Sequence, residues 1–90
     1  MNYISINIER EEYDSFVKAI PSDNRLPASY YGWIKNRLQE DSDRMAQGGT
    51  INKVVVHYED FTRYCRTTGQ KPSYEMLNAC ASAKFGRLNL

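Results

Sequence analysis

The 90-residue sequence has no long hydrophobic run, because polar or charged residues interrupt each apolar segment well before the roughly 20 residues that a membrane-spanning helix needs. Its first residues do not resemble a secretion leader, so we expect a cytoplasmic protein that has no membrane partner. The sequence also lacks an excess of one charge, with a formal net charge of +1. Such a chain is not typical of proteins that bind bulk nucleic acid or anionic membranes.

Residues that bind metals or act as catalysts are scarce. The chain has two cysteines, Cys65 and Cys80, whose spacing does not match a zinc motif. We therefore predict two small buried thiols, no metal and no cofactor. The single histidine, His57, precedes Glu59 and Asp60, as a general base with an orienting carboxylate would. No nucleophile motif or phosphate loop accompanies it, so we predict a strand-end or surface histidine, no catalytic residues and no enzyme activity.

Charge is distributed unevenly between the two halves of the chain. Residues 1–50 contain six basic and eight acidic residues, whereas residues 51–90 contain six and three. We therefore expect any basic binding face in the second half. Arg63, Arg66 and Lys71 gather there around a predicted turn, either as contacts to phosphate or as ordinary solubilising charge.

The first half changes from a strand pattern to helical patterns. Residues 2–8 alternate apolar and polar side chains and predict a strand with one covered face. An amphipathic helix follows up to Ile20, and Pro21 ends it. Pro27 opens a second helix, which ends at Gly48 and its neighbour. One side of that second helix carries the residues that we expect to face inward: Tyr31, Ile34, Leu38 and Met45.

The second half repeats the same kinds of element. Residues 50–58 are rich in β-branched side chains and predict a second strand. A short helix then places Phe61, Tyr64 and Cys65 inward and ends at Gly69. Pro72 and Ser73 open the last helix. Its predicted inward stripe is Tyr74, Leu77, Ala81, Phe85 and Leu88, and its predicted exposed positions are Glu75, Asn78 and Ser82.

These elements predict a single α+β domain, residues 1–90, with two strands and four helices in β-α-α-β-α-α order. The stretches "ISINI" and "VVVHY" are alike, as are "LPASYY" and "KPSYE", so residues 1–49 and 50–90 are a possible pseudo-repeat. We expect the two strands to pair antiparallel, at the pseudo-twofold between the repeats. A two-stranded ribbon alone is marginally stable, so we expect the helices to cover one face of it. The uncovered face would carry Ser5 and Asn7 from the first strand and Lys53 and His57 from the second.

The segment "ISINIEREEYDSFVKAI", together with "LPASYYGWIKNRLQE", resembles the ribbon-helix-helix family of small DNA-binding proteins over about residues 3–40. In that family, polar strand residues enter the major groove and the N-terminus of the second helix holds a phosphate. The resemblance implies a DNA-binding regulator in which Ser5 and Asn7 read bases and the backbone near Ser29 binds phosphate. The candidate DNA contacts are Ser5, Asn7, Arg25, Ser29, Lys53, His57, Arg63, Arg66 and Lys71.

The alternative function is a protein-interaction module, such as an accessory or inhibitor protein. Tyr30 and Trp33 lie beside the predicted inward stripe, and large amphipathic rings are enriched at protein interfaces. They are either partly exposed for docking or wrapped by the other helices. The sequence therefore leaves the partner open between DNA and another protein, and the chain between monomer and homodimer.

Overall fold

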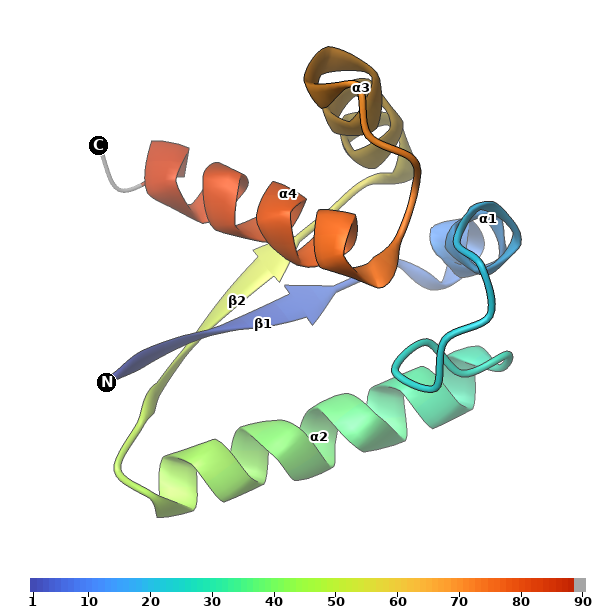
Figure 1. Cartoon of the computed structure of the whole chain (residues 1–90). Coiled ribbons are helices and arrows are strands. Elements are labelled where there is room, and N and C mark those ends of the chain that lie inside the picture. The colour runs from blue at the N-terminus through green and yellow to red at the C-terminus, as the bar shows by residue number, and fades with distance from the viewer. Residues whose placement is uncertain (89–90) are drawn as a thin grey trace.

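A computed structural model describes residues 1–88 of the chain. The elements are β1 (Asn2–Asn7), α1 (Arg10–Ala19), α2 (Tyr30–Ala46), β2 (Thr50–Val55), α3 (Tyr58–Thr68) and α4 (Tyr74–Leu88). The predicted α+β class and the β-α-α-β-α-α order are confirmed. Figure 1 shows the strand pair at the centre, with α2 on one side of it and α4 on the other. None of the described helices is both long and apolar enough to cross a membrane.

The two strands run parallel, so our prediction of an antiparallel pair is wrong. They align in register between residues 48 positions apart, from Asn2 beside Thr50 to Asn7 beside Val55. The reason lies in the connection, because α1 and α2 form a helical crossover that returns the chain to the end of the pair where β1 begins. Helices therefore cover both sides of the pair, as is usual for parallel strands, and not one face as predicted.

The core lies between the strand pair and the helices. In α1, the predicted amphipathic helix is confirmed, with Tyr13 and Phe16 buried on its inward side. The Phe16 ring meets the Tyr58 ring edge-on and lies 5.4 Å from the Phe61 ring, centroid to centroid, so aromatic packing joins α1 to α3. In α4, the stripe is buried at Tyr74, Leu77 and Ala81 and partly buried at Phe85, while the side chain of Leu88 lies outside the described residues.

Cys65 and Cys80 are free and buried, which confirms the prediction of two structural thiols. Burial raises the pKa of both thiols. The reactive thiolate form is therefore disfavoured at neutral pH, and both side chains act as small apolar groups in the core.

The second helix is rotated relative to our prediction. Tyr31, Leu38 and Met45 were expected inside, but they are exposed at 79%, 65% and 57%. Of the predicted inward set, only Ile34 packs against the core. The fully buried residue of this helix is Trp33, so the alternative in which the other elements wrap this ring is the one observed.

The burial of Trp33 explains the rotation, since this ring offers the largest apolar area on the helix. The residues that follow it on the inward side are polar but engaged. The Arg37 guanidinium lies over the Trp33 ring at 4.9 Å, and the Arg44 guanidinium lies over the Tyr3 ring at 4.6 Å. Ser5 Oγ donates a 2.9 Å hydrogen bond to Asp41 Oδ2. Polar residues of β1 thus meet polar residues of α2, and a search for apolar stripes alone selects the wrong side.

Two glycines allow the chain to pass from α2 into β2. Gly48 has a φ of +85°, in the left-handed region that side chains rarely adopt. A Cβ at Gly49 would clash with the Tyr3 ring and with the Arg44 carbonyl oxygen, so this position leaves no room for a side chain. The turn therefore holds the end of α2 close to the start of β1.

Candidate functional site

The outward face of α2 carries an exposed apolar row, which we call the α2 row: Tyr31, Leu38 and Met45. These residues are seven positions apart, which is close to two helical turns. They therefore lie almost in line along the 17-residue helix, roughly 10 Å from one to the next. Exposed apolar residues are common one at a time, but several aligned on one element are typical of a binding surface.

The remaining outward residues of α2 fill the space around the row. Lys35 and Ser42 are exposed and lie between its members, and Ile34 flanks it and is partly buried against the core. In the described part of the chain, Lys35 makes no hydrogen bond or ion pair. The row is therefore apolar at its centre and polar along one side, as interface helices usually are.

The strand pair is uncovered on one side of α2. The register places Lys53 beside Ser5 and Val55 beside Asn7, and neighbouring residues in parallel strands point to the same face. Ser5 is buried against Asp41 of α2, whereas Lys53 and Val55 are exposed. This face is thus covered at β1 and open at β2.

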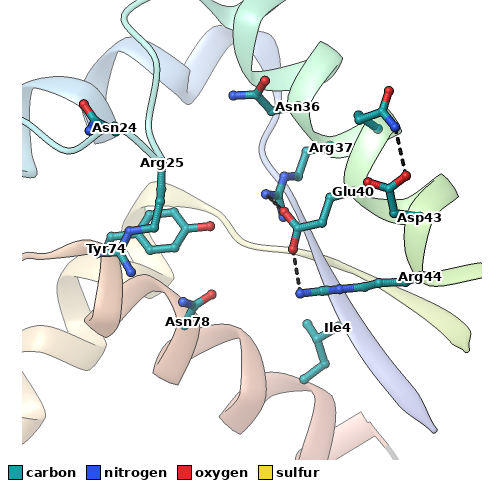
Figure 2. Close-up of a pocket in the computed structure, with 11 residues that line it drawn as sticks. Ile4, Asn24, Arg25, Asn36, Arg37, Glu40, Asp43, Arg44, Tyr74 and Asn78 are labelled. Carbon is teal, nitrogen blue, oxygen red and sulfur yellow. Dashed lines mark hydrogen bonds and ion pairs between the residues drawn. The ribbon is translucent and has the colours of Figure 1, made fainter. Parts of the chain in front are cut away.

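A polar cleft of about 510 Å³ lies between α2 and α4, with Ile4 of β1 among the residues that line it. Figure 2 shows Glu40 reaching both Arg37 and Arg44, and the Arg44–Glu40 distance is 2.6 Å. Across the cleft, the Arg25 guanidinium lies over the Tyr74 ring at 4.4 Å. It also pairs with Asp23 and Glu75 at 2.7 Å each, and it lowers the pKa of Asp23 to about 2.

Because each arginine of the cleft already has a carboxylate partner, an anionic ligand would have to displace these ion pairs. The cleft is therefore better described as the boundary between α2 and α4 than as a preformed anion-binding site.

Glu12 and His57 join the beginnings of α1 and α3. His57 Nδ1 lies 2.8 Å from Glu12 Oε2, and the Tyr58 N–H donates a 2.9 Å hydrogen bond to Glu12 Oε1. The hydrogen bond with Glu12 raises the pKa of His57, and the same bond lowers the pKa of Glu12. With Glu9, these groups bring three possible metal ligands within 4.8 Å of one another. Their hydrogen bonds already give Glu12 and His57 a structural role, and the absence of a metal stays a prediction.

Ser5 and Asn7, the strand residues that the resemblance assigned to base reading, have other partners. Ser5 is 1% exposed and bonded to Asp41, and the Asn7 side-chain amide donates to the carbonyl oxygen of Ser5. Lys53 is exposed on β2. Base readout would need these side chains to be free on an accessible strand face.

The other candidates are spread over several elements. Arg25 is held in the cleft, and Ser29 caps α2 by accepting a hydrogen bond from the Gly32 N–H. Arg63 pairs with Glu59 on α3 at 2.9 Å. Arg66 and Lys71 are exposed, at the end of α3 and in the loop that follows.

The residues suggested for protein docking are largely internal. Trp33 is fully buried, and Tyr30 is half-buried with its hydroxyl donating to the Ile8 carbonyl oxygen. The exposed ring is that of the neighbouring Tyr31, which sequence reasoning placed inside. The polar residues of β1 are the signal in the sequence that could identify the inward side of α2, because they favour a polar side of that helix against them.

Comparisons with models of known protein families, with curated proteins and with solved structures give no match to this chain. They leave the ribbon-helix-helix resemblance untested, although the parallel strand pair is not the ribbon that we predicted. The function is therefore inferred from the geometry of the chain itself.

Proposed function

We propose that this protein is an interaction module that binds another protein through the outward face of α2. The observation that supports this proposal is the exposure of Tyr31, Leu38 and Met45 in one row of a single helix. Fully burying a Leu or Met side chain is worth about 1.5–3 kcal/mol, so a partner that covers the row gains a substantial driving force. Val55, exposed on the open face of β2, would add to the same surface.

The last helix shows that such a face is not a requirement of this fold. On α4, the outward positions Glu75, Asn78 and Ser82 are polar and exposed. Each helix packs around a large, fully buried apolar side chain, Trp33 in α2 and Leu77 in α4, yet of these two helices only α2 also has an apolar row on its outward side among the described residues. Exposed apolar rows carry a solubility cost, and a binding role explains why this one is present.

A photo-reactive amino acid placed at position 38 in cells tests the proposal. The matched control carries the same amino acid at position 82, on the outward side of α4. We expect position 38 to give a discrete adduct that position 82 does not give. The protein in the adduct would then be identified, purified and titrated.

We expect Leu38→Glu to weaken that binding at least about 30-fold, as the loss of an interface anchor does, and Ser82→Glu to leave it unchanged. Equal adducts from both positions, or no adduct from position 38, would reject the proposal.

A further inference from the structure

We infer that the protein bound by the α2 row is a second copy of this chain, in an antiparallel pair of α2 helices with its two-fold axis at Leu38. This inference rests on the proposed function and names its partner. The α2 row is symmetric about its centre, because Tyr31 and Met45 each lie seven residues from Leu38. A two-fold axis there packs Leu38 against itself and Tyr31 against Met45 of the second copy. Such a self-complementary patch is what a two-fold symmetric interface requires.

The contact between Tyr31 and Met45 is chemically favourable in this arrangement. A methionine sulfur near an aromatic ring is a stabilising contact, and the unbranched Met side chain adapts to the ring edge. In a parallel pair, Tyr31 would face Tyr31 and Met45 would face Met45, and this contact would be lost.

Charge along α2 favours the antiparallel direction. Arg37, Glu40, Asp41 and Arg44 are engaged within the chain, and the two exposed charged residues of the helix are Lys35 near its start and Asp43 near its end. An antiparallel pair brings opposite ends together and also opposes the two helix dipoles. Lys35, which has no partner within the described residues, then lies within one turn of the level of Asp43 of the second copy.

The open face of β2 gives the second helix a place to lie. Lys53 and Val55 share their face of the strand pair with Ser5, which α2 covers. A second α2 lying along the row on the β2 side extends that helical layer across both strands. Parallel strands are normally covered by helices on both faces. Dimerisation would extend the helical layer over β2, which the single chain leaves exposed on this face.

The size of this surface sets the expected strength. One helix pair of this length is smaller than a standard interface of about 1,600 Å², so we expect a dissociation constant in the micromolar range. Sedimentation equilibrium of the full chain from about 1 to 300 µM should therefore show the mass rising from 10.5 kDa toward twice that value.

In the same experiment, Leu38→Glu should stay monomeric while Ser82→Glu behaves like the natural sequence. Circular dichroism and thermal unfolding confirm that both variants fold. A natural chain that stays monomeric at 300 µM would overturn the inference.

Cysteine pairing tests the antiparallel direction. Cys65 and Cys80 are buried, so introduced surface cysteines report alone. A mixture of Tyr31→Cys and Met45→Cys chains should form a mixed disulfide on mild oxidation, and neither variant should cross-link with itself. Self-linking of Tyr31→Cys would overturn the antiparallel arrangement.

Charge reversal tests the Lys35 contact independently. Lys35→Glu and Asp43→Lys should each weaken association several-fold, because each places like charges opposite one another. The two changes together should restore association. If the double variant does not recover association, Lys35 and Asp43 do not contact each other in the interface.

The photo-reactive residue at position 38 separates this inference from the proposed function. An adduct of twice the chain mass, which contains only this chain, supports both. An adduct with a different protein, from a chain that stays monomeric at 300 µM, keeps the proposed function and overturns the inference. The absence of any adduct rejects both.

Discussion

In the first β-α-α unit β1 leads to α1 and α2, and in the second unit β2 leads to α3 and α4. The strands and the first helices correspond at a constant separation of 48 positions, with Asn2 matching Thr50 and Arg10 matching Tyr58. The second helices also begin alike. Ser29 Oγ accepts a hydrogen bond from the Gly32 N–H, and Ser73 Oγ accepts one from the Met76 N–H.

Aligned on these serines, the two helices share a fully buried position near their start and differ on the outside. Trp33 and Leu77 occupy the same place and are both fully buried. On the outer side, Tyr31 corresponds to Glu75 and Leu38 corresponds to Ser82. The shared buried position anchors each helix in the core, whereas the outward residues are free to differ. The fold therefore does not require the apolar outward face of α2, and the proposed association would account for it.

The largest expected effect tests the buried position that α2 and α4 share. Trp33→Ala should lower the free energy of unfolding by about 3–5 kcal/mol, and Leu77→Ala by about 2–5 kcal/mol, because each leaves a cavity in the core. A domain of this size has only about 5–15 kcal/mol in total, so both variants should be visibly destabilised in urea unfolding. A loss below 1 kcal/mol for Trp33→Ala would mean that α2 does not pack through this ring.

The next largest effect tests the outward sides of α2 and α4, where the two helices differ. Leu38→Glu should weaken self-association by about 2 kcal/mol or more, while changing the stability of the monomer by less than about 0.5 kcal/mol. Ser82→Glu should change neither quantity. Sedimentation and urea unfolding at low concentration measure the two effects separately. A large stability loss in monomeric Leu38→Glu would place Leu38 inside the fold.

Equal caps should give equal effects in the two units. Ser29→Ala and Ser73→Ala each remove the acceptor for one backbone N–H at a helix start, which typically costs about 1 kcal/mol. Thermal or urea unfolding of the two variants measures both losses. If only one of the two variants loses stability, the two serine caps do not contribute equally, although their hydrogen bonds are alike.

The order of the elements follows from local patterns, and the sequence was sufficient to find it. Pro21, Gly69 and the β-branched run before His57 mark boundaries through backbone preferences that need no tertiary context. Two further features depend on long-range contacts. The strand direction is set by how the α1–α2 crossover returns the chain, and the inward side of α2 is set by which face meets Ser5 and Tyr3.

The candidate docking face was mislocated for the same reason. The apolar spacing of Tyr31, Leu38 and Met45 is that of a buried stripe, and no local signal separates a core stripe from an interface stripe. The distinction needs the partner surface within the fold, which here is the polar side of β1.

The smallest expected effect concerns one of the contacts between the two units, the hydrogen bond between Glu12 and His57. Hydrogen bonding with Glu12 raises the pKa of His57 above its usual 6.5. The contribution of protonated His57 to the stability of the fold is therefore complete below pH 6.5, and it is lost as the pH rises through the pKa of His57 in the folded chain. The pKa of Glu12 is lowered from 4.5, so its contribution is present above pH 4.5 and is lost as pH falls through its folded-state value. Both contributions therefore coincide between about pH 4.5 and 6.5.

Urea unfolding of the natural chain and of His57→Gln, from pH 4 to 9, measures this contribution as a difference. The difference should be largest in that window and should shrink at higher pH as His57 loses its proton. It should stay smaller than a cap effect, because both side chains are partly exposed and water screens the pair. Glu9 and Lys84 also act on His57, so Glu12→Gln serves as the partner variant and should remove most of the same pH dependence. A difference that is constant from pH 5 to 9 would mean that the two units are not joined by this ion pair.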